Sequence, residues 1–256
     1  MTKLTVEIIP VLSDNYVYLL HEAEAGVTGV VDPAVAEPVM ERLAARGWSL
    51  DWILSTHHHD DHTAGNLDLK RATGCKIAGP GKDAARIPGI DLELVEGERF
   101  QLGKEEAVVF ETPGHTSGHI SYWFAGSDAL FSADTLFSLG CGRLFEGTPA
   151  QMWDSLQKYA PLPDEALVYC GHEYTASNAR FALSVDPDNA ALQARAKEVE
   201  SQRAAGQPTI PTTLGQERAT NPFLRAADRG IRQQLGMETA SNTEVFAEIR
   251  RRKDSF

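Results

Sequence analysis

Residues 55–66 read STHHHDDHTAGN and place four histidines and two aspartates at consecutive positions. Such a run does not suit the interior of a helix or a strand, because burying these polar groups without partners is costly. The run is internal and follows the short apolar segment 52–56, so it does not have the form of a terminal histidine tag. We interpret it as a site that uses imidazole and carboxylate groups together, rather than as a solvated turn rich in histidine.

The spacing within this run sorts its side chains into two groups. If the preceding strand continued through the run, His57 and His59 would point to one side and His58 to the other, as a supporting residue. Two imidazoles on one side are the beginning of a metal site. Asp61 and His62 follow at an expected helix start, from which both could reach a second ion. The pattern H-x-H-x-D-H can therefore divide its ligands between two metal ions.

Three further segments repeat the pattern of an apolar strand that leads to a histidine or an aspartate. His115 follows a Pro-Gly turn in TPGHTSGH, Asp134 follows an apolar run in SADT, and His172 follows a strand and a glycine in CGHEY. Each of these is weak evidence alone. A sheet that gathers its strand ends at one edge would bring them into a single cleft. Five histidines and two aspartates without cysteine suit zinc, iron or manganese.

The chain changes character near Tyr174. Before this point, short apolar segments alternate with polar turns and predict mixed strands and helices in an α/β arrangement. Beyond it, segments rich in Ala, Arg, Gln and Glu predict helices, and residues 207–221 predict a long loop. The expected C-terminal helices cover residues 177–184, 189–205 and 243–253. We therefore predict a catalytic domain over residues 1–173 and a helical domain over residues 174–256.

Composition and charge exclude several classes of protein. The formal net charge of -12 argues against partners such as nucleic acid or an anionic membrane surface.

The sequence has an odd number of cysteines, and they lie far apart: Cys75, Cys141 and Cys170. We therefore expect reduced, buried thiols rather than disulfides. The N-terminal segment shows no pattern of a signal peptide or a membrane helix, and the expected location is cytoplasmic. No apolar stripe predicts self-association, so we expect a monomer.

Together these motifs resemble the metallo-β-lactamase superfamily. The run H-x-H-x-D-H, followed in order by His115, Asp134 and His172, is highly specific for it. The resemblance implies an α/β fold, namely a four-layer αβ/βα sandwich with two metal ions at one edge. The segments GCGRLFEGT, GHEYT, NPFLR and the terminal RRRKDSF narrow the resemblance to glyoxalase II, the family of hydroxyacylglutathione hydrolases. The predicted helical domain would then help to bind glutathione.

The family pattern implies roles for individual residues of this chain. Two divalent ions, expected to be zinc and otherwise iron or manganese, would be bridged by Asp134. Their other ligands would be His57, His59 and His115 for one ion, and Asp61, His62 and His172 for the other. A hydroxide held between the ions by Asp134, His59 and Asp61 would be the nucleophile.

Glutathione would be bound by Arg143, Phe145, Tyr174, Arg250 and Lys253. Arg143 stands where many animal relatives carry lysine, and Phe145 where they carry tyrosine, so a hydrogen bond to glutathione worth about 1 kcal/mol is lost at the second position. Arg250 and Lys253 lie three residues apart on the predicted last helix and share a face, which suits an anionic tripeptide.

The resemblance implies a thioester hydrolase. Its substrates would be S-D-lactoylglutathione and related 2-hydroxyacyl glutathione thioesters, with glutathione and D-lactate as products, in the second step of methylglyoxal degradation. An alternative within the superfamily is a glutathione persulfide dioxygenase, which uses one iron and has a less complete set of ligands for a second ion. A non-catalytic metal-binding module is a further alternative, but structural zinc sites are usually closed and rich in cysteine.

Overall fold

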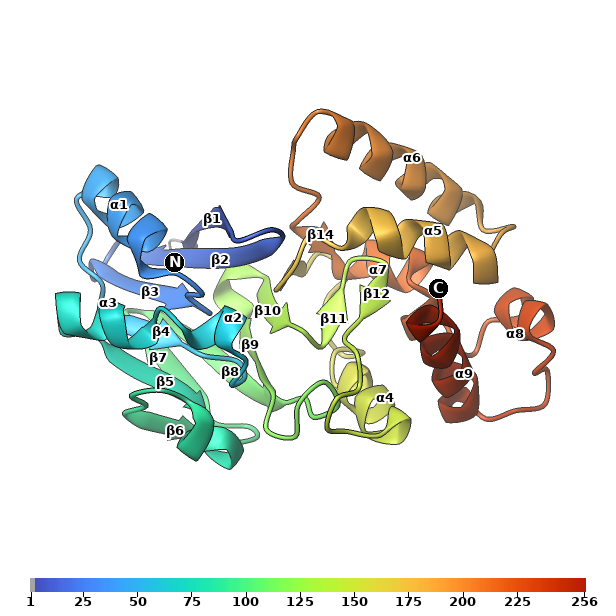
Figure 1. Ribbon diagram of the computed structural model, residues 1–256, viewed down its shortest axis with the longest axis horizontal. Coiled ribbons are helices and arrows are strands. Elements are labelled where there is room, and N and C mark those ends of the chain that lie inside the picture. Colours follow the sequence, from blue (N-terminus) through green and yellow to red (C-terminus); the bar gives the residue numbers. More distant parts are fainter. Residues whose placement is uncertain (1–2) are drawn as a thin grey trace.

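Two six-stranded sheets face each other in the computed structural model, which describes residues 3–256 (Figure 1). Residues 1 and 2 of the predicted catalytic domain lie outside the described residues. The strands of the first sheet, in spatial order, are β1 (Thr5–Val11), β2 (Asn15–Glu22), β3 (Val27–Val31), β4 (Trp52–Leu54), β5 (Lys76–Pro80) and β6 (Leu92–Leu94). The pairs from β3 to β6 are parallel, whereas β1, β2 and β3 pair antiparallel.

The second sheet has the order β14-β13-β10-β9-β8-β7 and is antiparallel except between β10 and β13. Its strands are β7 (Arg99–Leu102), β8 (Glu105–Glu111), β9 (Ile120–Phe124), β10 (Ala129–Ala133), β13 (Leu167–Cys170) and β14 (Thr212–Thr213). A small hairpin formed by β11 (Leu136–Phe137) and β12 (Gly140–Cys141) follows β10. Short 3-10 helices cover Gly81–Arg86, Ala125–Ser127 and Pro222–Leu224.

Helices cover the outer face of each sheet. The first sheet carries α1 (Ala36–Arg46) and α3 (Asn66–Thr73), with the single turn α2 (Asp60–Thr63) beside them. Val39 and Leu43 lie one turn apart on α1 and are both buried against this sheet, and Gly47 ends the helix in the left-handed conformation, as the sequence predicts. The second sheet carries α4 (Pro149–Gln157) and the C-terminal helices.

Three apolar clusters separate the four layers. In β2, Tyr18 and Leu20 point into the cluster between the sheets, whereas Val17 and Leu19 point towards α1. Both faces of this strand are therefore buried, which explains its nearly unbroken apolar sequence. The third cluster joins the second sheet to the helices that cover it. The predicted four-layer sandwich with an added helical segment is confirmed.

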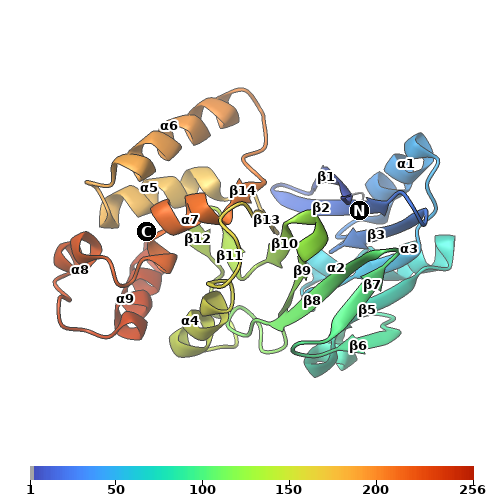
Figure 2. The same cartoon turned by 180° about the vertical axis from the view of Figure 1, so that it is seen from behind.

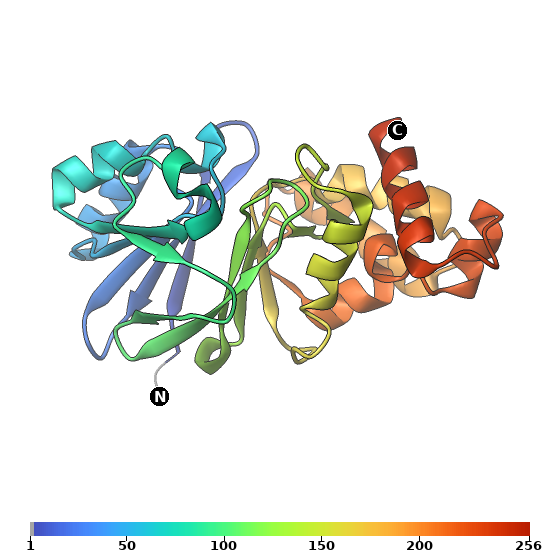
Figure 3. The same cartoon turned by 90° about the horizontal axis from the view of Figure 1, so that it is seen from below.

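The C-terminal helices lie at the end of the molecule away from α1 and α3 (Figures 2 and 3). They are α5 (Thr175–Val185), α6 (Ala190–Ala204), α7 (Leu214–Thr220), α8 (Arg229–Leu235) and α9 (Asn242–Asp254). Ser241 and Glu244 form a capping box that starts α9. Trp153 of α4 contacts Phe246 of α9, so this helix packs directly on the sandwich. The boundary between residues 173 and 174 stays a prediction.

The long loop predicted over residues 207–221 is wrong, because this segment contains β14 and α7. Thr213 caps α7 by accepting a hydrogen bond from the Gln216 amide. Glu217 of α7 is fully buried and accepts hydrogen bonds from Ser138 and from the Leu139 amide. These tertiary contacts stabilise a helix whose own sequence shows little apolar periodicity.

Two further expectations concern cysteines and membrane spans. Cys75, Cys141 and Cys170 are all buried and free, as predicted. Among residues 3–256, no helix combines the length and apolarity needed to cross a bilayer.

Candidate metal centre and adjoining pocket

The seven predicted metal ligands converge at one edge of the two sheets, where β4, β8, β10 and β13 end. Their segments do not continue as strands: β4 ends at Leu54, so the expected extension of this strand to His59 is wrong. The reason is that the Thr56 amide donates to the Asp32 carboxylate at 2.8 Å instead of to a neighbouring strand. The chain then turns into α2 at Asp60, and His57 and His59 reach the site from a loop.

The first group of ligands comprises three histidines whose nitrogens lie within 4.8 Å of one another, namely His57, His59 and His115. His59 Nδ1 and His115 Nε2 are 3.1 Å apart. His57 is fully buried, and its Nε2 has no hydrogen-bond partner among the described residues. A buried nitrogen that faces other nitrogens without a partner fits a metal ligand.

The second group comprises Asp61, His62 and His172, which also lie within 4.8 Å of one another. The Nε2 atoms of His62 and His172 are 3.2 Å apart. One oxygen of Asp61 lies 3.6 Å from His62 Nε2 and 3.5 Å from His172 Nε2. The group therefore offers two imidazoles and one carboxylate to a second ion.

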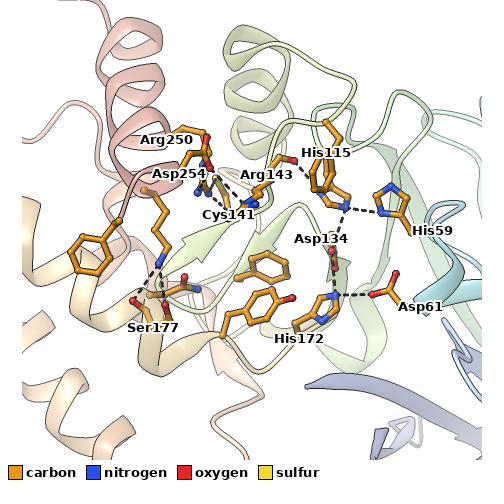
Figure 4. A pocket seen from close by; sticks show the side chains of 16 residues that line it. His59, Asp61, His115, Asp134, Cys141, Arg143, His172, Ser177, Arg250 and Asp254 are labelled. Atoms are coloured by element: carbon orange, nitrogen blue, oxygen red, sulfur yellow. Dashed lines mark hydrogen bonds and ion pairs between the residues drawn. The ribbon is translucent and has the colours of Figure 1, made fainter. Parts of the chain in front are cut away.

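The Asp134 carboxylate lies between the two groups (Figure 4). Its Oδ2 is 3.4 Å from His115 Nε2 on one side and 3.4 Å from His172 Nε2 on the other. Its Oδ1 is 3.6 Å from His62 Nε2 and has no hydrogen-bond partner among the described residues. This is the placement that a carboxylate bridging two ions requires.

The distances between the ligand atoms and the ionisation of Asp134 both show whether the site suits metal ions. Ligands placed at 2.0–2.2 Å around a tetrahedral ion are about 3.4 Å from one another, and the separations above cluster around that value. Burial opposes ionisation of Asp134, but the surrounding histidines outweigh it and hold the pKa of this carboxyl well below its ordinary value. Asp134 is therefore ionised at neutral pH, as a metal ligand must be.

Four hydrogen bonds orient the imidazole rings, and no sequence motif predicted them. His57 Nδ1 donates to Thr56 Oγ1, His62 Nδ1 to Asp32, His115 Nδ1 to the Arg143 carbonyl, and His172 Nδ1 to Asp14. Each donation leaves the Nε2 lone pair of that ring directed at the site. Asp14 and Asp32 lie far from the histidine run in sequence, and only the fold brings them to these rings.

Removing one of these acceptors is expected to weaken metal binding. In Asp14→Ala, His172 loses the 2.8 Å hydrogen bond that fixes its ring, and the affinity for the second ion should fall about 10- to 100-fold. Metal titration followed by calorimetry measures this. Asp68→Ala, which makes the same change at an exposed aspartate that pairs with Arg71, is the matched control and should leave the affinity unchanged. Equal affinities in Asp14→Ala and in the unmodified protein would contradict this role.

Two histidines of the sequence motifs do not face the site as ligands. His58 points away and lies 3.2 Å from Asp83, as expected for a supporting residue. His119 is buried, and its Nε2 accepts a hydrogen bond from the Asp134 amide. This ring therefore holds the backbone of Asp134 in place.

A charged network holds the 143–147 segment against the turn that carries His115. Arg86 donates to both oxygens of Glu146, at 2.5 and 3.0 Å, and to Asp83 at 2.5 Å. Glu146 also accepts a hydrogen bond from the Ser117 amide at 2.7 Å. His58, Asp83 and Glu146 lie close enough to hold an ion, but the Arg86 guanidinium already supplies the positive charge among them. The network therefore fixes the position of the Arg143 and Phe145 segment.

A pocket of about 580 Å³ extends from the candidate metal centre to the C-terminal helix (Figure 4). All five predicted glutathione-binding residues line it: Arg143, Phe145, Tyr174, Arg250 and Lys253. Tyr174 stacks in parallel on His172, with ring centres 4.7 Å apart, and Phe145 contacts His115 edge-on. The pocket thus joins an aromatic-flanked ligand cluster to a group of cations.

Known proteins resemble this chain over its whole length. A family model for the metallo-β-lactamase superfamily matches residues 13–172, and a model for the hydroxyacylglutathione hydrolase C-terminus matches residues 173–256. A hydroxyacylglutathione hydrolase from Methylococcus capsulatus is 57% identical over 248 residues, which is 97% of each chain. The chain belongs to the hydroxyacylglutathione hydrolase family. Another member, from Rhodospirillum rubrum, is 56% identical over 256 residues and matches over the full length of both chains.

Solved structures show the same fold at lower sequence identity. ETHE1 from Myxococcus xanthus has a TM-score of 0.70 and 24% identity, covering 96% of this chain and 90% of that chain. The BLEG-1 B3 metallo-beta-lactamase has a TM-score of 0.66 and 24% identity, covering 86% of this chain and 99% of that chain. The fold and the cluster of histidines and aspartates together support a binuclear metal site in this chain.

Proposed function

We propose that this protein hydrolyses S-D-lactoylglutathione and related 2-hydroxyacyl glutathione thioesters to glutathione and a 2-hydroxy acid. The observation that carries the proposal is a single pocket with a two-ion ligand cluster at one end and three cationic side chains at the other. Glutathione has two carboxylates and is anionic at neutral pH, so the cationic end suits it. The relatives above are named for this activity, which favours it over a persulfide dioxygenase or a non-catalytic module.

The proposed ion-binding residues would be His57, His59, His115, Asp61, His62 and His172, with Asp134 between the two ions. Divalent ions bound there would lower the pKa of a bound water and so supply a nucleophile at neutral pH without a separate base. Asp134, His59 and Asp61 would fix the position of this water relative to the thioester carbonyl. The hydrogen bonds to Asp14 and Asp32 keep the rings oriented while the substrate changes shape.

The remaining proposed contacts concern substrate orientation. Arg143 and Lys253 would attract a carboxylate of glutathione to the far end of the pocket, which directs the thioester towards the ligand cluster. The pKa of Tyr174 is raised by burial and by nearby carboxylates, so its hydroxyl keeps its proton at neutral pH and can donate a hydrogen bond to the substrate. Phe145 lacks such a hydroxyl and offers only an apolar face.

We also propose that the ions are zinc, with iron or manganese as alternatives, and that the chain acts as a monomer in the cytoplasm. The ligand set of five imidazoles and two carboxylates supports zinc without excluding the other two metals. Metal analysis of protein purified without added metal identifies the ions. Size-exclusion chromatography with light scattering on the same protein gives the oligomeric state.

The direct test of the function is the loss of thioester absorbance of S-D-lactoylglutathione on the purified protein, with metal content measured on the same sample. We expect rapid hydrolysis with close to two ions per chain. Treatment with a chelator should abolish hydrolysis, and added zinc should restore it. Two bound ions without hydrolysis would refute the proposed substrate, and oxygen uptake with glutathione persulfide would then be the next measurement.

The affinity for substrate should depend on pH through Lys253. Burial and three neighbouring arginines lower the pKa of Lys253 to about 8. Below that pH the side chain is positive and attracts the anionic substrate; above it the charge is lost, so KM should rise between about pH 7 and pH 9. In Lys253→Arg the charge persists across this range, and the rise in KM should disappear. A KM that stays constant with pH in the unmodified protein would contradict this role.

A further inference from the structure

The cationic end of the pocket already contains one carboxylate of the protein. Asp254 lies in the last turn of α9 and lines the pocket together with Arg143, Arg250 and Lys253. Among the described residues that line the pocket, it carries the only side-chain carboxylate at this end, since Asp61 and Asp134 belong to the ligand cluster. An anionic substrate that enters the pocket therefore meets both attraction from the cations and repulsion from Asp254.

The Arg250 side chain is fully engaged with protein groups. Its Nη1 donates to the Cys141 carbonyl at 2.9 Å, and its Nε and Nη2 donate to one Asp254 oxygen at 3.1 and 2.8 Å. The guanidinium also stacks over the Phe223 ring at 5.2 Å. The arginine is buried, with 6% of its side chain exposed, whereas 44% of the Asp254 side chain is exposed. Asp254 thus occupies the edge of the Arg250 guanidinium that carries Nε and Nη2.

Asp254 also faces the second arginine of the pocket. Arg143 Nε lies 3.9 Å from the same Asp254 oxygen that accepts from Arg250. One carboxylate therefore sits between two guanidinium groups that come from different parts of the chain (Figure 4). Two arginines arranged around a carboxylate are also what a bound anionic ligand requires.

We propose that Asp254 occupies the position of a substrate carboxylate in the free protein and competes with it for Arg250 and Arg143. Binding of the anionic thioester then exchanges one carboxylate for another, and the exposed Asp254 side chain turns towards solvent. Asp254 is in this way a specificity-determining residue that limits the affinity for anionic ligands. The inference rests on the proposed function, because it takes a glutathione thioester as the ligand.

The test is Asp254→Asn, which keeps the size and an oxygen acceptor for Arg250 but removes the charge. KM for S-D-lactoylglutathione should fall about fivefold with kcat unchanged. The variant removes an exposed ion pair that exists in the free protein and is already broken in the complex, so only the free protein is destabilised. Glu248→Gln is the matched control, because Glu248 lies on the same helix, pairs with Arg251 and Arg252, and does not line the pocket. It should leave KM unchanged.

Binding of free glutathione, measured by calorimetry, separates this inference from the proposed reaction. Tighter binding of glutathione in Asp254→Asn supports the competition even if neither protein hydrolyses the thioester, and in that case only the proposed function fails. Hydrolysis with an unchanged or higher KM in Asp254→Asn overturns the competition and makes Asp254 a residue that positions Arg250. Thioesters with each carboxylate esterified in turn should identify the group that competes, because the variant gains no affinity for the thioester that lacks it.

Discussion

Asp134→Asn is expected to abolish thioester hydrolysis and to leave fewer than two ions per chain. Asp134 lies between the two ligand groups, 3.4 Å from His115 Nε2 and 3.4 Å from His172 Nε2. An amide supplies one neutral oxygen where the site needs a charged carboxylate with two, so the ions repel each other with less compensation. We expect kcat/KM to fall by roughly a thousandfold or more, because several kcal/mol of charge stabilisation are lost.

The measurement is kcat/KM together with metal content in the same preparation. Asp60→Asn is the matched control, because it makes the same chemical change inside the histidine run at an exposed side chain. That control should keep both ions and full activity. Two tightly bound ions and near-normal hydrolysis in Asp134→Asn would show that this carboxylate does not bridge the ions.

Gly171→Ala is expected to damage the site with the smallest possible change in side chain. A methyl carbon at this position would overlap Asp134 Oδ1 and would lie 2.8 Å from His62 Cε1. Neither group can move away easily, because Asp134 is buried and His62 is held by Asp32. We expect loss of at least one ion, a fall in kcat/KM of about a hundredfold or more, and a loss of about 1–3 kcal/mol in the free energy of unfolding.

Metal content, kcat/KM and denaturant unfolding measure these three effects. Gly79→Ala is the control, because its methyl carbon would meet its nearest neighbour, the Ser55 Cβ, at an ordinary 3.4 Å. It should retain both ions and activity. If Gly171→Ala also retained them, the close packing between this glycine and Asp134 would not be required for the site.

The histidine run and the strand ends are readable in the sequence because both depend on local chemistry. Consecutive imidazoles and carboxylates are too costly to bury without binding partners. Short apolar segments that end in His115, Asp134 or His172 indicate strands that end at a common edge of a sheet. The fold class follows from the alternation of such segments with helices. The expected strand through His59 failed because the Asp32 side chain, distant in sequence, takes the amide that a strand neighbour would have bonded.

The C-terminal segment shows the same limit. The helices over residues 177–184, 189–205 and 243–253 were predictable from propensity and periodicity, and the structure has helices there. The helix α7 was not, since it is held by hydrogen bonds from Ser138 and the Leu139 amide to the buried Glu217 carboxylate, and these partners lie more than 70 residues away in sequence.

The sequence by itself determined which side chains are available for metal and anion binding, because residue type and local spacing set their chemistry. Only the tertiary structure decided how they are used. It directs the Nε2 atoms of His57, His62, His115 and His172 into one centre through distant acceptors such as Asp14, and it places Asp254 against Arg250 and Arg143. These relations depend on distances and angles between segments far apart in the chain, and such long-range geometry is fixed by packing rather than by local pattern.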